Sequence, residues 1–523
     1  MSQGGAAGDR RFEHAVELCR WLGALRTASG TDVRTALRLG GGVSLWDVVE
    51  PFLALYRFPL LFSGGPPAAP WRRALRGRLS RVKGRALAPM RSERGCREWP
   101  AGKGAVLVLG FVPTFYRDVL RSVADDLAAD GGRGVVVAGE KRLRPAAAGP
   151  GAGAPAFHAI WDHWDARAEE ESRTLLGRLR AARKAIVPAV RAAAAGGRGP
   201  RAVDPAALAA EWSWLFAHEL RRLGAHLAAA RHILVSHRPA LIVSADDADQ
   251  RCRVFSLAGK ALGIPSLLVQ QGLSTRDYPE WRFFSPDKVA AMNESSRTDM
   301  IAQGVPPERI VVTGQPGFDR FLVPAPGRRE RVRAALGVGE GRTMVLFASQ
   351  PYQVGAFRSP GVRAAMLAAV VRAAASIDRI ALVVKPHPGE SRSRLARLVG
   401  PSPRTILAGR EDDLGGLILA CDVFMTFFST SVLQALYARK PVVTVDFPDA
   451  GTPDPYSRSG ATWTARSEEE IAALLRRLAE GGADGAGGER EAARVRFLEE
   501  TAYRPDGGAT SRVARLAREM LVP

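Results

Sequence analysis

The chain has 523 residues, 46% of them hydrophobic, and carries 74 Lys plus Arg against 53 Asp plus Glu, a formal net charge of +21. This length suits roughly two to four domains with sizeable cores, which excludes a small disulfide-stabilised factor, and the apolar content excludes a chain that is disordered throughout. Of the basic residues, 66 are Arg and only eight are Lys. Such an excess is typical of GC-rich coding, so the charge does not predict nucleic-acid binding, although other anionic partners remain open.

The cysteines and the N-terminus indicate the compartment. The four cysteines are far apart and form no CxxC pair, which argues against a zinc site or a disulfide framework and favours a reducing cytoplasm. They are Cys19, Cys96, Cys252 and Cys421. Residues 1–17 lack the apolar core of a signal peptide. The most apolar tract, 414–438, contains the charged Asp422 and several Ser and Thr residues, so we expect a buried strand followed by a helix and no transmembrane helix.

Residues 1–100 are predicted to form a mainly helical N-terminal extension. An apolar stretch at 53–62 precedes a Gly-Gly-Pro-Pro breaker at 64–67. The segment Arg72–Arg97 then contains ten basic residues and one acid, with apolar residues near helical spacing, which predicts a basic amphipathic helix. Two interpretations stay open for it: a solvated helix or linker, or a contact with an anionic membrane surface.

Short β-branched runs alternate with helical stretches in two further regions, 101–325 and 326–523. The predicted buried strands are 105–109, 134–138, 241–245, 266–270, 288–292, 310–313, 343–348, 380–384, 404–408, 422–427 and 441–445, and a long helix is predicted over 166–195. Because parallel neighbours need crossover connections, this alternation predicts an α/β fold with two Rossmann-like, doubly wound parallel-sheet domains that face a cleft.

The strongest motif is Lys385-Pro386-His387-Pro388-Gly389, directly after the predicted strand 380–384. Ligands of such sheets bind at the carboxyl ends of strands. Two prolines stiffen the turn, and a cation beside an imidazole suits an anionic phosphate held without a metal. The alternative is a Pro-rich turn with an incidental histidine.

A second motif, Ser429-Thr430-Ser431, follows the predicted strand 422–427 and opens a predicted helix over 432–438. A hydroxyl there can cap the helix, and the uncapped N–H groups with the helix dipole attract a phosphate. Capping explains one of the three hydroxyls, so the run favours a ligand site. Gln434, one turn further on, is placed to reach a ribose.

Taken together, the segments 385–388, 429–436 and 440–443 resemble the C-terminal, nucleotide-binding half of GT-B-fold bacterial surface-carbohydrate transferases. This group includes capsule polysaccharide transferases, polysialyltransferase-like enzymes and CDP-glycerol glycerophosphotransferases, and UDP-N-acetylglucosamine 2-epimerases share its fold. Further segments, 263–272, 312–319 and 506–512, agree with the resemblance, which covers about residues 235 to 515.

The resemblance implies that 101–325 is an N-terminal acceptor domain and 326–523 a C-terminal nucleotide-sugar-binding domain, and it implies a role for each matching position. Lys385, His387 and Pro388 would contact the phosphates of the nucleotide, and Ser429, Thr430, Ser431 and Gln434 would complete that site. On the acceptor side of the cleft, the matching positions are Gln271, Gly272, Gly314 and Gln315. Family members usually carry His at the position of Gln271 and Glu at that of Gln434, so these departures imply an altered donor or lost activity.

A catalytic base is expected elsewhere. Asp246, Asp247 and Asp249 follow the predicted strand 241–245, where a carboxylate can deprotonate an acceptor hydroxyl. The competing interpretation is a helix N-cap with solvated acids. Asp247-Ala248-Asp249 also matches the DxD metal motif of the other major glycosyltransferase fold, but two letters recur by chance.

Other motifs give no function. His158 and His163 lack a third ligand at metal spacing and are expected to pack locally or to line an acceptor pocket, and His237, before a strand, is expected to be structural. The chain has no GxGxxG fingerprint, no GxxxxGK[ST] loop and no GxSxG elbow, so dinucleotide oxidoreductases, P-loop enzymes and serine hydrolases have no support.

The sequence therefore predicts a cytoplasmic GT-B glycosyltransferase that needs no metal and no cofactor besides its nucleotide-sugar co-substrate. Asp246 or Asp247 would be the base, and His387 would stabilise the leaving group. The expected acceptor is a surface polysaccharide or a lipid-linked glycan, met at the inner face of the membrane through Arg72–Arg97. Two alternatives stay open: a non-hydrolysing nucleotide-sugar 2-epimerase, which the sparse carboxylates and Gln271 disfavour, and an inactive GT-B scaffold that binds a nucleotide or polymer.

Overall fold

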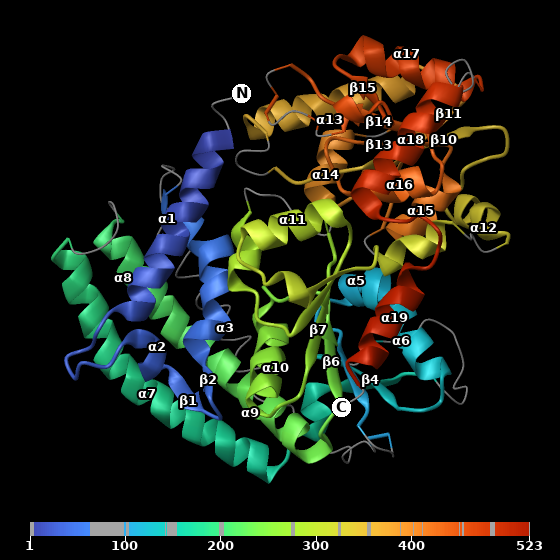
Figure 1. The fold of residues 1–523 in the computed structure, drawn as a ribbon. Coiled ribbons are helices and arrows are strands. Elements are labelled where there is room, and N and C mark those ends of the chain that lie inside the picture. The colour runs from blue at the N-terminus through green and yellow to red at the C-terminus, as the bar shows by residue number, and fades with distance from the viewer. Residues whose placement is uncertain are drawn as a thin grey trace. The chain divides into compact units, whose positions relative to one another are not determined.

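A computed structural model describes the chain in two compact units (Figure 1). The described residues are 5–62, 99–100, 104–141, 143, 154–197, 203–272, 278–322, 326–352, 357–387, 389–400, 402–409, 412–448, 450–451, 454, 456–481 and 487–521. Unit 1 comprises Met1–Ala291, Ser296–Pro316 and Thr510–Pro523, and unit 2 comprises Met292–Ser295 and Gly317–Ala509.

Unit 1 is built on a sheet of seven parallel strands in the order β5-β4-β3-β6-β7-β8-β9. The strands are β3 (Val106–Leu109), β4 (Val135–Gly139), β5 (Ala156–Ala159), β6 (Leu241–Ser244), β7 (Ser266–Val269), β8 (Lys288–Ala291) and β9 (Ile310–Val312). The chain builds outward from β3 to β5, returns, and builds the other way from β6. The strand order thus reverses between β3 and β6, which makes the sheet doubly wound.

Helices cover both faces of this sheet, because its strands are apolar on both sides. Val106 and Val108 pack with α6 and α19, whereas Leu107 and Leu109 pack with α7, α9 and α10. The helical elements are α5 (Pro113–Phe115), η3 (Tyr116–Leu120), α6 (Arg121–Ala129), η4 (Ile160–His163), α7 (Ala166–Ala195), α8 (Pro205–Trp214), η5 (Leu215–Glu219), α9 (Leu220–His237), α10 (Gln250–Ala261), η6 (Pro279–Phe283), α11 (Glu294–Ala302), η7 (Pro307–Arg309) and α19 (Ala509–Glu519). The last helix returns to unit 1, where Arg518 pairs with Asp126 at 2.7 Å.

The described part of the N-terminal segment packs into the same core. It contains α1 (Gly5–Ala24), α2 (Val33–Ala36), α3 (Leu45–Phe52), η1 (Leu53–Arg57), η2 (Phe58–Phe62) and a small antiparallel pair, β1 (Arg38–Gly40) and β2 (Val43–Ser44). Ser44 caps α3 by accepting a hydrogen bond from Trp46 N. The fully buried Trp46 stacks on Trp212 of α8 with ring centroids 6.0 Å apart. This segment is therefore an integral layer of unit 1.

Unit 2 repeats the design with a sheet of six parallel strands in the order β12-β11-β10-β13-β14-β15, and its strand order reverses between β10 and β13. The strands are β10 (Thr343–Ala348), β11 (Ile380–Lys385), β12 (Thr405–Leu407), β13 (Val423–Thr426), β14 (Val442–Val445) and β15 (Trp463–Ala465). The helical elements are η8 (Pro316–Phe321), α12 (Arg328–Ala335), α13 (Pro360–Ala375), α14 (Arg392–Val399), α15 (Leu414–Ala420), α16 (Ser431–Tyr437), η9 (Ser457–Ser459), α17 (Glu468–Ala479) and α18 (Gly487–Ala502).

The predicted fold class, two Rossmann-like doubly wound α/β sheets, is confirmed by these two strand orders. All eleven predicted strands and the helix over 166–195 are present, and β1, β2, β5 and β15 are additional. The tract 414–438 contains the expected buried strand followed by a helix, β13 and α16, and the additional helix α15 precedes the strand. The unit limits also differ from the predicted ranges 1–100, 101–325 and 326–523, since the N-terminal segment and α19 share the cores of unit 1.

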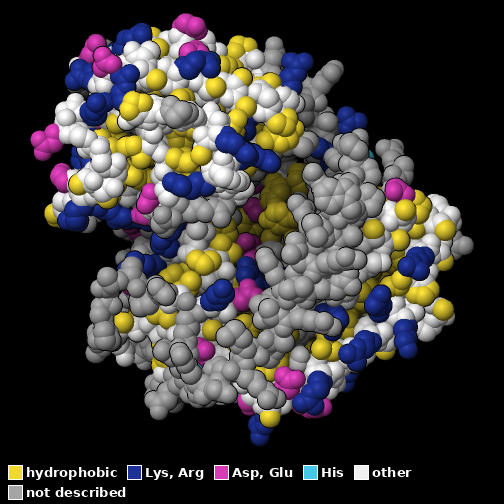
Figure 2. All heavy atoms as spheres, turned by 180° about the vertical axis from the view of Figure 1, so that it is seen from behind, with side chains coloured by type: hydrophobic (Ala, Val, Ile, Leu, Met, Phe, Trp, Pro, Cys, Tyr) yellow, Lys and Arg dark blue, Asp and Glu magenta, His cyan; other side chains and the backbone are white. Residues whose placement is uncertain are grey.

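The charge is spread over the surface. On the face shown in Figure 2, Lys and Arg side chains are scattered among acidic and apolar ones. The basic segment Arg72–Arg97 lies outside the described residues. Within the described ranges, no helix is both long enough and apolar enough to cross a membrane.

Candidate functional site

The predicted site residues lie at the carboxyl ends of strands in both units. In unit 2, the turn around His387 follows β11 and the hydroxyl run follows β13. In unit 1, Asp246 and Asp247 follow β6, and Gln271 follows β7. These strands adjoin or neighbour the point where the strand order of each sheet reverses. Ligands of open α/β sheets bind at such points.

The imidazole of His387 is held in a defined orientation. Its Nδ1 atom accepts a hydrogen bond of 3.0 Å from the backbone N of Gly389, so Nδ1 carries no proton and Nε2 is the N–H donor of the neutral ring. Burial lowers the pKa of His387 below its ordinary value, while the nearby Glu390 charge acts in the opposite direction. The ring is therefore a neutral donor at pH 7, suited to a phosphate oxygen.

Lys385 is placed differently from what a phosphate ligand requires. Its side chain is buried, and Nζ donates a hydrogen bond of 2.5 Å to the carbonyl oxygen of Gly409, after β12. This bond ties the end of β11 to the neighbouring strand end, so Lys385 supports the turn in the structure as it stands. Pro388 lies outside the described residues.

The three hydroxyls after β13 differ in their surroundings. Ser431 is buried and donates to Ser429 Oγ at 2.7 Å, and Ser431 N donates to the same oxygen at 3.2 Å. The Ser429 hydroxyl thus binds the first residue of α16, whereas Thr430, the N-cap residue, is exposed and its side chain makes no cap hydrogen bond. Gln434 lies one turn further on, and within the described residues its buried Oε1 has no hydrogen-bond partner. That oxygen is an acceptor available to a ligand hydroxyl.

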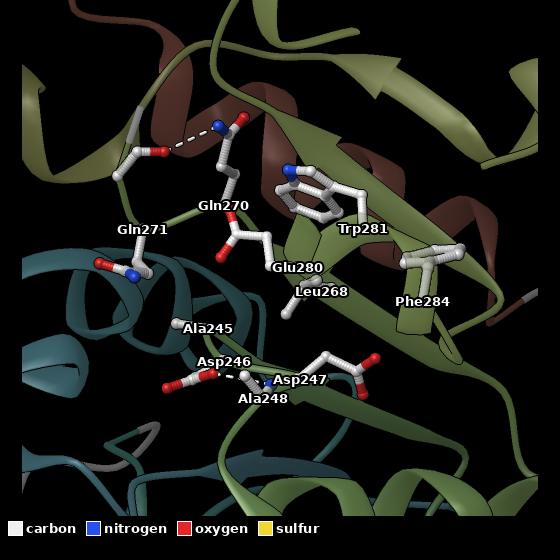
Figure 3. A pocket seen from close by; sticks show the side chains of 11 residues that line it. Ala245, Asp246, Asp247, Ala248, Leu268, Gln270, Gln271, Glu280, Trp281 and Phe284 are labelled. Carbon is white, nitrogen blue, oxygen red and sulfur yellow. Dashed lines mark hydrogen bonds between the residues drawn. The ribbon is translucent and has the colours of Figure 1, made fainter. Parts of the chain in front are cut away.

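Unit 1 contains a pocket at the carboxyl ends of β6 and β7 (Figure 3). It combines carboxylates, amides and aromatic rings, and none of its lining residues is cationic. The lining residues are Ala245, Asp246, Asp247, Ala248, Leu268, Gln270, Gln271, Gly272, Glu280, Trp281 and Phe284. Carboxylates and amides beside an aromatic wall suit a polyhydroxyl ligand such as a sugar.

Asp246 has the properties of a general base. Its Oδ1 accepts hydrogen bonds from the backbone N atoms of Ala248 and Asp249, at 2.8 and 3.0 Å. In the described part of the chain, nothing donates to Oδ2. Burial, and then the charge of Asp249, raises the pKa of Asp246 to about 7. A base with a pKa near the working pH is the most effective one.

Asp247 is engaged in structural bonds instead. Figure 3 shows it pointing to the opposite side from Asp246. Its carboxylate accepts from Arg253 Nη1 at 2.7 Å and from the backbone N and Oγ of Ser285 at 3.0 and 2.8 Å. Asp249 caps α10 and pairs with Arg251. The two acids of the DxD match are thus neutralised by arginines, which does not favour metal binding there.

Glu280 is a pocket residue that the sequence did not predict. It lies on η6, and burial, followed by the charge of Asp246, raises its pKa to about 7. Trp281, next to it, forms the apolar wall. The sequence signal for Glu280 was weak, because this acid between Pro279 and Trp281 belongs to no periodic apolar pattern and follows no predicted strand. In the structure it is the third carboxyl group of the pocket, beside Asp246 and Asp247.

Of the glutamine and glycine positions expected on the acceptor side, Gln271 and Gly272 line this pocket. Gln271 is exposed at its edge, and Gly272 O accepts a hydrogen bond of 2.7 Å from Gln270 Nε2. Gln315, which is buried, donates from Nε2 to the carbonyl oxygen of Gln270 at 2.8 Å. Gly314 has a φ of 83°, a conformation that favours glycine. Gln315 therefore supports the loop that carries Gln271, and neither it nor Gly314 lines the pocket.

Three histidines form a separate buried cluster. His163 bonds to His158 at 2.9 Å and to His237 at 3.1 Å, and Trp99 stacks on His237 with centroids 4.3 Å apart. Burial, and then the neighbouring His158, lowers the pKa of His163 to about 4. The rings are partners of one another, consistent with the structural role expected for His237. Among the residues described, no group of three or more His, Cys, Asp or Glu is arranged to hold a metal.

No family model and no curated protein matches the chain. Among solved structures, it is similar to a UDP-GlcNAc 2-epimerase from Neisseria meningitidis bound to UDP-GlcNAc, at 11% identity and a TM-score of 0.48 over 80% of this chain and 100% of that one. It is also similar to a glycosyltransferase from Rickettsia africae, at 12% identity and a TM-score of 0.44 over 81% of this chain and 100% of that one. The wall teichoic acid polymerase TagF is similar at 12% identity and a TM-score of 0.47, over 87% of this chain and 98% of that one. These proteins are of the kinds that the sequence motifs resemble, and at such identities the likeness concerns the fold alone.

Proposed function

We propose that this protein is a glycosyltransferase that moves a sugar from a nucleotide-activated donor to a glycan or lipid-linked acceptor. The observation that carries the proposal is the fixed Nε2–H donor of His387 at the carboxyl end of β11, within the motif that resembles the nucleotide site of GT-B enzymes. A neutral donor aimed at a diphosphate stabilises the charge that develops as the glycosidic bond breaks. Gln434 Oε1 is the proposed acceptor for a ribose hydroxyl.

The acceptor half of the proposal rests on the pocket of unit 1. Asp246, whose pKa lies at about 7, would take the proton of the attacking hydroxyl. The proposal assigns no metal to the reaction, because the carboxylates of Asp247 and Asp249 are held by Arg253 and Arg251. Nucleotide sugar is the co-substrate and no further cofactor is invoked.

The direct test is nucleotide binding by the His387→Ala variant. Thermal shifts with CMP, CDP, UDP, GDP and TDP identify the nucleotide that stabilises the wild-type chain, since a ligand of the folded state raises its apparent stability. The variant should lose most of that shift. Turnover of the corresponding nucleotide sugars should fall with it, and an unchanged shift together with unchanged turnover would refute the phosphate role.

A second function, the non-hydrolysing nucleotide-sugar 2-epimerase, gains one specific observation. Two of the three carboxyl groups that line the pocket of unit 1, those of Asp246 and Glu280, have pKa values of about 7, and an epimerase needs such groups around the sugar. Incubation with nucleotide sugar alone separates the two activities, because an epimerase turns over without an acceptor. Nucleotide binding without turnover under either condition would instead support the inactive scaffold.

We also propose a cytoplasmic location with a peripheral contact at the inner face of the membrane through Arg72–Arg97. Its support is the ten basic residues in this short segment. Liposomes containing anionic lipid should retain the full chain at low salt and release it at high salt. A chain lacking residues 72–97 that binds equally well would refute the contact.

A further inference from the structure

A buried ion pair in unit 2 lies directly beneath the turn that carries His387. Its members are Arg363, on α13, and Glu390, two residues before α14, with 6% and 8% of their surfaces exposed. Arg363 Nη2 is bonded to Glu390 Oε1. Neither side chain has a part in the function proposed above. A charged pair so deeply buried needs an explanation, because the desolvation of both ions offsets much of their attraction.

Glu390 forms hydrogen bonds with both the N–H and the carbonyl group of His387. Its Oε2 accepts a hydrogen bond of 2.9 Å from the backbone N of His387, and its own backbone N donates to the carbonyl oxygen of His387 at 2.9 Å. Both polar groups of the His387 main chain are therefore held by one residue. The imidazole bond from Gly389 N adds a third restraint on the same turn.

Arg363 connects Glu390 to the end of the neighbouring strand, β10. Its Nε donates to the carbonyl oxygen of Gln350 at 2.5 Å, and its Nη2 donates to Ser349 Oγ at 3.0 Å. Ser349 Oγ in turn lies 3.1 Å from Glu390 Oε1. Ser349 and Gln350 directly follow β10. The ion pair thus joins the ends of β10 and β11, which are adjacent in the sheet.

The same network reaches the hydroxyl run after β13. Gln350 Oε1 accepts a hydrogen bond of 2.9 Å from the backbone N of Phe428, next to Ser429. β13 lies on the other side of β10, across the point where the strand order reverses. One chain of hydrogen bonds therefore connects the two segments predicted to hold the phosphates.

We propose that the buried Arg363–Glu390 pair is a positioning element of the phosphate site: it fixes His387 relative to the segment at Ser429 so that both meet one diphosphate. This inference rests on the proposed function. The geometry supports positioning over simple stabilisation, because well-packed apolar residues stabilise a fold as well as a buried ion pair does. What apolar side chains cannot supply is the acceptor for His387 N and the donor for Gln350 O.

The test replaces both charges together. The Arg363→Met, Glu390→Met double variant removes the pair without leaving one charge buried alone, so unit 2 should stay folded. A matched control removes a second Arg–carboxylate contact from the same sheet: Arg333→Met with Asp422→Met, a pair 3.0 Å apart at the other, amino-terminal end of β13.

Two readouts report positioning. The first is the NMR titration of the His387 imidazole without ligand, assigned by comparison with His387→Gln. The second is the affinity for inorganic pyrophosphate, which presents a diphosphate without a base. In the Arg363/Glu390 double variant, the Nε2–H tautomer of the neutral ring should no longer dominate, and pyrophosphate should bind about tenfold more weakly. The control should match the wild type in both.

A wild-type tautomer of His387 and wild-type pyrophosphate affinity in a folded Arg363/Glu390 double variant would overturn the inference. If that variant does not fold, Glu390→Gln answers the question, because its remaining amide oxygen can serve either His387 N or Arg363 but not both; unchanged readouts there also overturn it. The outcome is distinct from failure of the proposed function. If His387→Ala binds nucleotide normally, the phosphate role falls, whereas a silent ion-pair variant beside a defective His387→Ala removes the positioning role alone.

Discussion

The backbone N of Gly389 donates a hydrogen bond of 3.0 Å to Nδ1 of His387, which leaves Nε2 as the proton-bearing atom of the ring. A Cβ atom at Gly389 would come within 3.3 Å of the same Nδ1, so the small residue allows the close approach. The site therefore needs a donor at the Nε2 position, and it needs neither a charge nor a base there.

This tautomer predicts opposite outcomes for two amide substitutions. The amide nitrogen of His387→Gln can reach the Nε2 position, whereas that of His387→Asn lies near the Nδ1 position. A hydrogen bond to a charged phosphate contributes about 1.5–3 kcal/mol, so His387→Asn should weaken nucleotide binding about 10- to 100-fold, with His387→Gln closer to the wild type. Calorimetric titration with the nucleotide found by thermal shift checks this. Equal losses in both variants would contradict the assigned tautomer.

The two adjacent aspartates after β6 should separate catalysis from stability. Asp247→Asn disrupts the buried contact with Arg253 and Ser285 and should cost about 2–4 kcal/mol of unfolding free energy. Asp246→Asn should not lower the unfolding free energy but should abolish turnover. Wild-type turnover should also increase with pH through about 7, because the base acts when deprotonated. Urea unfolding followed by tryptophan fluorescence reports on unit 1, which holds nine of the ten tryptophans. An active Asp246→Asn enzyme would move the base elsewhere.

The sheets were predictable from sequence because their strands are buried on both faces and are therefore continuous apolar runs, as in β10 and β11. β5 and β15 escaped for the opposite reason. Both are edge strands with partly exposed residues, and β5 contains His158 while β15 contains Trp463 and Thr464. Such a mixed segment has no hydrophobic periodicity to distinguish it from a loop.

The candidate site was predictable where a functional residue follows a strand end: the positions of His387 and Asp246 came from that rule, whereas Gln271 came from the family resemblance. Side-chain direction did not follow from it: Asp246 and Asp247 are neighbours in sequence, yet the contacts of Asp247 with Arg253, in the first turn of α10, and with Ser285 separate their roles. Glu280 and Arg363 were not predicted because tertiary packing alone brings them to the site.

The carboxyl pair in the pocket predicts a stability that declines as pH rises. The folded-state pKa values of Asp246 and Glu280 lie at about 7, against about 4 in an unfolded chain. Between pH 4 and 7 the folded state keeps protons that the unfolded state has lost, so unfolding free energy falls across this window and levels off above it. Glu280→Gln removes one of the two groups and should stabilise unit 1 at pH 8 by about 2 kcal/mol. No gain at pH 8 over pH 4.5 would contradict the raised pKa.

Two buried histidines of unit 1 predict a contribution to the unfolding free energy with the opposite slope, over nearly the same pH range. Burial, and then the charge of Arg222, lowers the pKa of His226 to about 4, and burial likewise lowers that of His163 to about 4. Below pH 6.5 the unfolded state binds protons that the folded state does not, so their contribution is complete above about 6.5 and is lost as pH falls toward 4. At pH 5, each of the two histidines should lower the unfolding free energy by about 2 kcal/mol.

The variant His226→Asn separates this effect from general acid denaturation. Asparagine can still donate to the carbonyl oxygen of Arg222, which His226 Nδ1 contacts at 2.9 Å, but it does not titrate. The variant loses packing at every pH, so the comparison concerns slopes: between pH 7 and 5 its unfolding free energy should fall about 2 kcal/mol less than that of the wild type. Parallel slopes would mean that His226 is already able to take up a proton in the folded unit. Combining His226→Asn with Glu280→Gln should give a slope between those of the two single variants, because the two groups act with opposite sign over nearly the same range, between about pH 4 and 7.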